Sequence, residues 1–422
     1  MDFFLAVAML LSLTAVFAVV NERYLRLEPS IGLMLLAILT TFALAALKLA
    51  GGYDALSGVQ ALVQELDLSE VLLNGVLCFM LFAGSTGVKF ELLRENEWAI
   101  LSLAIGSTII ACGIVGALLS WGLGLLGIEL PLVYAFVLGA LISPTDPIAA
   151  LAILKPVGLP KRLEAIINGE SLFNDGVGVV LFTLALTQVQ GAGQETSPVS
   201  LFLREVLGGV GLGLLAGFAT HYLLLRTKDF GNQLLATLAT VSLGYSVALQ
   251  IDVSGPIAVV VAGLLVGNVT APRLTPEVHE PLRVFWSGID DVLNSLLFVM
   301  IGLLVVTVHD LDQASLIKLL PITILVCLIA RAISVYVPIA VLNRTPELDA
   351  DAVGLTKLLT WGGLRGGLAL ALALSLPDSA QKPLIINMTF AAVAFSVLVQ
   401  GSTISKLFQP SYLKTLLKPD RP

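Results

Sequence analysis

The chain has 422 residues, of which 57% are hydrophobic and only 13% are charged, and its formal net charge is −7. A mean hydropathy of +0.95 is far above that of a soluble globular protein, so the chain belongs in a lipid bilayer. The absence of any basic tract excludes a nucleic-acid-binding protein.

Apolar runs long enough to cross a bilayer, roughly 20 residues each, recur along the whole chain. Backbone groups in lipid must be paired within their own segment, and the alternation typical of barrel strands is missing, so these runs predict helices. We therefore expect an all-α polytopic membrane protein, and the stretch 49–70 is compatible with one further external or interfacial helix. The thirteen expected spans lie near 3–20, 30–48, 71–88, 98–126, 131–154, 163–190, 200–225, 231–250, 255–269, 282–308, 316–342, 353–376 and 384–408.

Lys and Arg are distributed very unevenly between the two sets of connections that these spans define. One set, which includes the C-terminal end, carries sixteen basic residues, the opposite set carries four, and three more lie inside helices. Because basic loops stay in the cytoplasm, we expect the N-terminus outside the plasma (inner) membrane and the C-terminus in the cytoplasm. Membrane lipid is therefore one expected partner.

Cysteines and histidines do not form a metal-ligating pattern. Each of the three cysteines stands alone inside an apolar run, and the three histidines lie near expected helix ends. This spacing argues against a histidine-ligated metal centre, and we expect no cofactor. The residues concerned are Cys78, Cys112, Cys327, His221, His279 and His309.

The fifth span is interrupted by the sequence Ser143-Pro144-Thr145-Asp146-Pro147. Proline removes a backbone donor and clashes with the preceding turn, so the helix should break here. Asp146 followed by Pro147 suits the N-cap and first turn of a helix that resumes, and a capping role alone is the simpler alternative for Asp146.

The sixth span contains the polar run 168–176, Asn-Gly-Glu-Ser-Leu-Phe-Asn-Asp-Gly. Helical spacing places Glu170 over Asn174 and Ser171 over Asp175, which predicts one polar face. Asp175 lies about 18 Å along the helix, near the bilayer midplane. An acid is expensive at that depth, so we assign Asp175 a functional role.

Three later spans also carry buried charges. Asp290 and Asp291 in the tenth span are expected to line an inner aqueous vestibule, with a second ion site as the alternative. Two arginines in later spans cannot lose their charge. They are Arg331 in the eleventh span and Arg365, which stands among glycines in Trp-Gly-Gly-Leu-Arg-Gly-Gly (361–367). We expect Arg365 to bind a carboxylate or carbonyl, with Glu170 or Asp146 as candidate partners, in a structural ion-pair cluster.

The two interrupted spans, the fifth and the twelfth, cross the membrane in opposite senses. Broken helices at corresponding places in two inverted repeats are typical of the binding site of a secondary transporter. The predicted division is a scaffold and dimerisation domain in 1–95 and 229–312, a core domain in 96–192 and 313–410, a linker helix in 193–228 and a cytoplasmic tail in 411–422.

Five motifs along nearly the whole chain resemble the NhaP-type sodium/proton antiporters of the cation/proton antiporter superfamily. They are Thr145-Asp146-Pro147, the run 169–176, Val-Ser-Gly-Pro-Ile-Ala at 253–258, Leu-Asn-Ser-Leu-Leu-Phe at 293–298 with Gly302, and Trp-Gly-Gly-Leu-Arg-Gly at 361–366.

This resemblance implies a homodimer whose core helices cross in the membrane middle. Asp175 would bind the cation or the proton, and Asn174 would stand beside it. Thr145 and Ser171 would supply oxygens, so that Asp175, Thr145 and Ser171 are the expected Na⁺ ligands. The resemblance also implies that Glu170, Asn174 and Arg365 support the site, that Asp146 balances the broken helix, and that Asn-Asp at 174–175 indicates electroneutral exchange.

Some relatives carry a further acid in the third span, where this chain reads Phe-Met-Leu-Phe-Ala-Gly-Ser at 79–85. If such a ligand is needed, Ser85 or water must replace it.

Competition at one carboxylate explains exchange without enzyme chemistry. Burial favours the protonated acid and a bound cation favours the ionised one, so Asp175 holds either a proton or a cation. Hard oxygen ligands suit Na⁺ or Li⁺ without excluding K⁺. A K⁺/H⁺ antiporter and a cation channel or uniporter are the alternatives, whereas a membrane enzyme has no GxSxG, HExxH or Cys/His motif to support it.

Overall fold

The computed structural model describes residues 3–50, 57–59, 70–191, 197–305, 313–344, 350–413 and 415–416. Helices make up nearly all of these residues, the described part contains no strand, and an isolated bridge joins Asp146 and Leu364. The predicted all-α fold class is therefore confirmed.

The helices follow one another in the order of the expected spans. The first half contains α1 (Phe3–Val20), α2 (Pro29–Leu49), α5 (Cys78–Thr86), α6 (Phe90–Glu95), α7 (Glu97–Leu101), α8 (Thr108–Leu125), α9 (Leu132–Ile142), α10 (Pro147–Leu154), α11 (Lys161–Val189) and α12 (Pro198–Arg226). The second half contains α13 (Phe230–Gln250), α14 (Gly255–Leu265), α15 (Pro276–Leu303), α16 (Gln313–Leu342), α17 (Ala352–Trp361), α18 (Gly367–Leu374), α19 (Lys382–Phe395), α20 (Ser402–Leu407) and α21 (Pro410–Leu413). Short π-helical segments and a 3₁₀ turn extend or join them, including η1 (Asn21–Leu25), η2 (Val71–Leu77), η3 (Ser102–Ser107), η5 (Val266–Thr270), η6 (Ala271–Arg273) and η8 (Ser396–Gly401).

Within the described residues, nine helical stretches are long and apolar enough to cross a membrane, and Val71–Thr86 and Leu132–Ile142 are shorter apolar helices. The chain is thus a multi-pass membrane protein. The count of thirteen crossings stays a prediction, and most of the stretch 49–70 and of the tail 411–422 lies outside the described residues.

The tenth span begins earlier than the apolar pattern indicates. We expected it from residue 282, but α15 begins at Pro276, because Thr275 and Pro276 start the helix and Glu277 lies in its first turn. Charged residues such as Glu280 and Arg283 lower the hydropathy of these first turns without preventing a helix.

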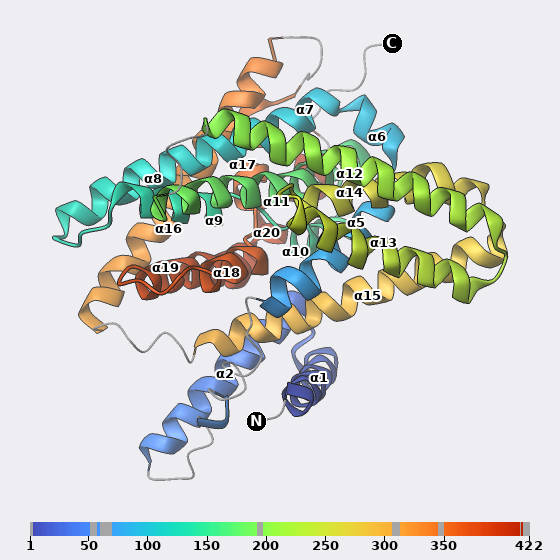
Figure 1. The fold of residues 1–422 in the computed structure, drawn as a ribbon. Coiled ribbons are helices and arrows are strands. Elements are labelled where there is room, and N and C mark those ends of the chain that lie inside the picture. The colour runs from blue at the N-terminus through green and yellow to red at the C-terminus, as the bar shows by residue number, and fades with distance from the viewer. Residues whose placement is uncertain are drawn as a thin grey trace.

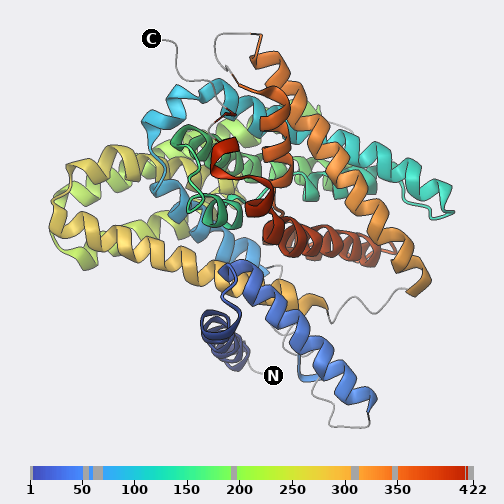
Figure 2. The same cartoon turned by 180° about the vertical axis from the view of Figure 1, so that it is seen from behind.

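The interrupted helices occupy the middle of the fold. Figure 1 shows α9, α10, α17 and α18 between the longer helices, while α1 and α2 stand at one edge, where α15 crosses α2. Figure 2 shows the same arrangement from behind, with α18 and α19 side by side. The chain therefore surrounds its broken helices with continuous ones.

Both predicted helix breaks are present. α9 ends at Ile142 and α10 starts at Pro147, and α17 ends at Trp361 before α18 starts at Gly367. Asp146 caps α10, since its Oδ1 accepts a hydrogen bond from the Ile148 amide at 2.8 Å. Proline breaks the first helix and the glycine-rich run relaxes the second.

Candidate functional site

The two broken helices are joined to each other through their interrupted segments. The Asp146 amide donates to the Leu364 carbonyl at 2.7 Å. The Arg365 guanidinium donates through Nη1 to the carbonyls of Ser143 at 2.6 Å and Pro144 at 3.0 Å. A cation at this position neutralises the negative carbonyl end of α9 and satisfies acceptors that the broken helix leaves unpaired.

Two glycines allow this crossing to be so tight. A Cβ atom on Gly178 of α11 would lie 2.1 Å from Cγ of Pro144, and one on Gly366 would lie 2.8 Å from Oδ2 of Asp146. Neither position has room for a side chain, so α11 and the second broken helix approach the first at backbone distance.

A cavity of about 570 Å³ lies beside the crossing. Its polar lining includes Thr145, Asp146, Ser171, Asp175 and Asp290. It also reaches Lys155, Glu164 and Arg283, whose side chains are partly exposed. The apolar part of the lining comes from several elements and includes Leu72, Val76, Leu77, Met80, Leu81, Pro144, Ile148, Leu151, Leu172, Leu297 and Leu368.

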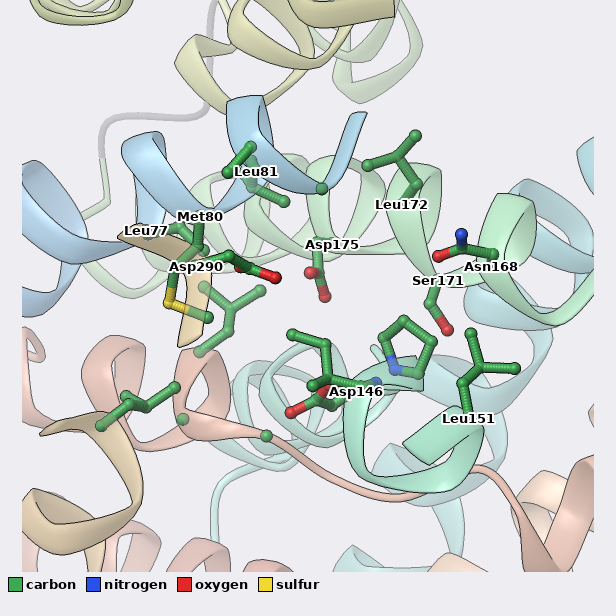
Figure 3. Close-up of a pocket in the computed structure, with 18 of the residues that line it drawn as sticks. Leu77, Met80, Leu81, Asp146, Leu151, Asn168, Ser171, Leu172, Asp175 and Asp290 are labelled. Atoms are coloured by element: carbon green, nitrogen blue, oxygen red, sulfur yellow. The ribbon is translucent and has the colours of Figure 1, made fainter. Parts of the chain in front are cut away.

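Asp175 and Asp146 present their carboxylates to this cavity from α11 and from the break before α10, and Figure 3 shows both facing the same space. No hydrogen bond or ion pair of the Asp175 carboxylate is found within the described part of the chain, whereas Asp146 uses one oxygen as a helix cap. A carboxylate of this kind is available to a proton or to a cation.

Two hydroxyl groups stand next to these carboxylates. The Oγ1 of Thr145 lies 3.3 Å from the Oγ of Ser171, and both side chains are buried in the cavity wall. Asn174 holds Thr145 in place: its Nδ2 donates to Thr145 Oγ1 at 2.9 Å, and its Oδ1 accepts from the Thr145 amide at 3.4 Å. Asn174 itself is fully buried and does not line the cavity, so its contacts are those of a positioning residue.

The two rows of the predicted polar face of α11 meet at Thr145, which Asn174 and Ser171 both contact, and Glu170 is the residue that departs from this face. Ser171 and Asp175 face the cavity, but Glu170 is turned away from it and forms an ion pair with Arg331 of α16 at 2.7 Å between Oε1 and Nη1. Glu170 and Ser171 are about 100° apart on the helix, which is enough to reach separate neighbours.

Arg365 likewise has other partners than the carboxylates that we expected. Glu170 is bound by Arg331, and Asp146 offers its backbone amide to the neighbouring Leu364. The guanidinium of Arg365 binds the two carbonyls at the end of α9 instead, which is the carbonyl alternative stated for it. Glu170 and Arg331 thus form the buried ion pair without Arg365.

Sequence reasoning missed part of the cavity wall. Glu164 and Asn168 precede Ser171 and Asp175 at helical spacing, and all four line the cavity. Lys155 faces Glu164 across the cavity mouth and pairs with it at 2.9 Å. Helical spacing alone identifies this whole row of α11, whereas the polar run 168–176 indicated only its central part.

Ser85, which we considered as a substitute ligand from the third span, does not reach the cavity. Its Oγ donates to the Phe82 carbonyl at 2.8 Å, and it packs against Gly263 of α14. The cavity-facing side of this span is mostly apolar, with Leu77, Met80, Leu81 and Gly84, and its polar residue there, Thr86, donates its hydroxyl to the Ala83 carbonyl at 2.8 Å.

Two interrupted helices that cross beside a free carboxylate, inside a multi-pass helical membrane protein, define a secondary transporter. The comparisons with known proteins agree. The family profile "Sodium/hydrogen exchanger, transmembrane" matches residues 3–409. The chain belongs to this family and is a cation/proton antiporter, a transporter and not an enzyme.

Individual relatives cover almost the entire chain. It is 37% identical over 413 residues to the Na(+)/H(+) antiporter NhaP of Pseudomonas aeruginosa, and the aligned region covers 96% of each protein. It is 31% identical over 419 residues to the Na(+)/H(+) antiporter NhaH of Halobacillus dabanensis, covering 97% and 98%. The solved structure of the antiporter MjNhaP1 of Methanocaldococcus jannaschii has the same fold, with a TM-score of 0.74 at 19% identity over 99% and 100% of the two chains.

Proposed function

We propose that the protein exchanges Na⁺, and also Li⁺, for H⁺ at Asp175. The observation that carries this proposal is the cavity-facing Asp175 carboxylate, which has no partner among the described residues and lies beside the hydroxyls of Thr145 and Ser171. These hard oxygens suit a small monovalent cation, and the same carboxylate binds a proton when the cation leaves. Asp146 contributes the second charge of the site.

Exchange follows if the protein changes from one open side to the other only when Asp175 holds a cation or a proton. The uptake of one ion is then always matched by the release of the other. One carboxylate that alternates between one cation and one proton gives electroneutral exchange. An imposed membrane potential should therefore leave the initial exchange rate in proteoliposomes unchanged, and a potential-dependent rate would overturn this stoichiometry.

The replacement of Asp175 tests the assignment directly. Asp175→Asn and Asp175→Ala keep or reduce the side-chain volume but remove the titrating charge, so both should abolish Na⁺-driven proton flux. Fluorescence dequenching in proteoliposomes measures this flux, and gel filtration and melting curves check the fold. Exchange at the wild-type rate in either variant would contradict the role of Asp175.

Two alternatives are separated by measurements on the unmodified protein. A K⁺/H⁺ antiporter would respond to K⁺ at concentrations where Na⁺ and Li⁺ are inactive, in a titration of all three cations against pH. A channel or uniporter would carry cation current without a proton gradient. The hydroxyl and carboxylate oxygens suit Na⁺ without excluding K⁺, so the titration decides between these two cations, and the cavity-facing carboxylate favours exchange over a channel.

We also propose the orientation and assembly of the transporter. Lys155, Glu164 and Arg283 at the cavity mouth lie towards the side that carries most of the basic loops, so the cavity faces the cytoplasm. The N-terminus is then outside and the C-terminus inside. A homodimer formed through the scaffold domain follows from the family resemblance, and cross-linking in native membranes tests it.

A further inference from the structure

A much smaller cavity lies between two buried arginines. It measures about 10 Å³, which is close to the space that one water molecule needs. Arg331 of α16 and Arg365, in the break between α17 and α18, both line it, and these residues are only 2% and 5% exposed. Thr360 of α17 and Gln400 of η8 contribute further polar side chains. The cavity is thus a buried polar space that shares no lining residue with the cavity beside Asp175.

Both arginines have N–H groups that the surrounding protein does not use. A guanidinium carries five N–H donors. Arg365 uses Nη1 for two carbonyls of the first break, and no acceptor for its Nε or Nη2 is found among the described residues. Arg331 uses Nε for the Leu359 carbonyl and Nη1 for Glu170, and its Nη2 has no partner in the same part of the chain. The two cations that line the cavity therefore keep donors for a ligand.

The other two polar residues of the cavity each bring an oxygen that can accept a hydrogen bond. The Oγ1 of Thr360 is buried and has no partner among the described residues. Thr356, one turn earlier in α17, instead donates to the Ala352 carbonyl at 2.6 Å, as threonine often does in a helix. Gln400 donates through Nε2 to the carbonyls of Thr360 and Trp361 at 3.3 and 3.2 Å, and no described residue donates to its Oε1.

A ligand that suits this cavity is small and both accepts and donates hydrogen bonds. One water molecule has these properties, because it accepts up to two hydrogen bonds and donates two. A halide ion would accept from the arginines, but it could not donate to Gln400 Oε1. The positive charges do not require an anion either, since Glu170 pairs with Arg331 and the carbonyl end of α9 binds Arg365. The polar groups of the wall therefore favour water.

We propose that this cavity, the arginine cavity, binds one structural water molecule. The water accepts hydrogen bonds from the two guanidiniums and donates to the oxygens of Thr360 and Gln400. It satisfies buried polar groups that would otherwise destabilise the fold. It also joins the ion pair between α11 and α16 to the crossing of the broken helices, so that these elements and η8 form one hydrogen-bonded unit. The site does not depend on the proposed exchange at Asp175.

A structure of the unmodified protein at a resolution that shows ordered waters tests the site directly. We expect one density peak in the arginine cavity, at about 2.7–3.2 Å from a nitrogen of each arginine and from Thr360 Oγ1. A cavity without density between well-ordered side chains would overturn the proposal. Crystals with bromide in place of chloride identify the ligand, because an anomalous signal at the peak would show an anion instead of water.

A substitution at Thr360 gives a second test, in which the presence of the water decides the sign of the effect. Thr360→Val replaces the hydroxyl with a methyl group of similar volume. If the water is bound, the substitution removes one of its partners and should lower the melting temperature in detergent by about 1–2 °C. If the cavity is dry, the substitution removes an unpaired buried hydroxyl, and the melting temperature should rise. An unchanged or higher melting temperature would overturn the proposal.

Thr356→Val is the matched control on the same helix. It also exchanges a threonine hydroxyl for a methyl group, but Thr356 bonds only to its own helix and does not line the arginine cavity. We expect a smaller change in melting temperature than for Thr360→Val. An equal fall in both variants would count against the water, because the loss of any hydroxyl from α17 would then explain the effect.

Discussion

Glu170 and Arg331 place two opposite charges deep inside the protein, and each is tolerable only because of the other. Their side chains are 1% and 3% exposed, and their charged atoms lie 2.7 Å apart. Arg331 also donates through Nε to the Leu359 carbonyl at 3.3 Å. The pair therefore ties α11 to α16 and to the end of α17 without touching the cavity.

Glu170→Gln should destabilise the protein strongly, because it leaves Arg331 buried without a counter-charge. The loss of one partner of a buried pair costs about 3–5 kcal/mol. Thermal unfolding in detergent, followed by intrinsic fluorescence, should show a clear fall in melting temperature. Lys382→Ala removes the Asp378 pair, in which the aspartate is fully exposed and screened by solvent, and should leave the melting temperature nearly unchanged. Equal effects of the two substitutions would contradict this role of Glu170.

Asp175 should make Na⁺ transport pH-dependent in a defined direction. A proton and a cation compete for one carboxylate, so the apparent KM for Na⁺ should rise as the pH falls, by about tenfold per pH unit where the proton dominates. Initial rates over a pH series, with Na⁺ varied at each pH, measure this slope. A KM that does not change with pH would mean that the two ions bind at different groups.

For individual residues, sequence patterns located the charged side chains but not their partners. Asp175 was identifiable because an acid at mid-membrane depth has few structural explanations. The partner of Arg365 was not, because backbone carbonyls at a helix break have no sequence signature. Asn174 was expected beside Asp175 as a supporting residue, but no sequence pattern identifies Thr145, 29 residues earlier, as its hydrogen-bond partner.

Among the helices, the crossing of α9–α10 over α11 depends on a missing side chain. Gly178→Ala would place a Cβ atom 2.1 Å from Pro144, so α11 and the break must move apart. We expect a substantial loss of transport and a lower melting temperature. Gly211→Ala on α12 is the matched control, because nothing lies within 4 Å of its added Cβ. Wild-type flux in Gly178→Ala would show that the crossing tolerates a wider spacing.

The breaks themselves could be predicted, since proline and clustered glycine act locally on the backbone. The start of α15 was missed because hydropathy reports exposure to lipid and not where a helix begins, although Thr275 and Pro276 do carry a sequence signal for a helix start. The bridge between Asp146 and Leu364 joins residues that are distant in sequence, and only the folded chain brings them together.

For the whole molecule, the cavity lies between the two domains that we expected from the sequence. Its wall combines α5 and α15 of the proposed scaffold with α10, α11 and α18 of the proposed core. If the core moves against the scaffold during transport, distances across this boundary should change, whereas distances within the core should not.

Pulsed electron paramagnetic resonance can measure this movement after the buried Cys78, Cys112 and Cys327 are replaced. Spin labels at the exposed positions Val284 and Lys161 span scaffold and core, and labels at Lys161 and Leu407 lie within the core. We expect the first distance distribution to differ between saturating Na⁺ and low pH, and the second to stay constant. A change in both pairs would contradict a rigid core.

The main-chain bond between Asp146 and Leu364, with the Arg365 contacts to two carbonyls, has a consequence for how such proteins diverge. Because backbone atoms accept or donate in each of these contacts, most side chains around the crossing are not needed to hold it together. Thr145 and Ser171 can therefore be exchanged during evolution while the crossing persists, and ion preference can drift under selection on an unchanged architecture.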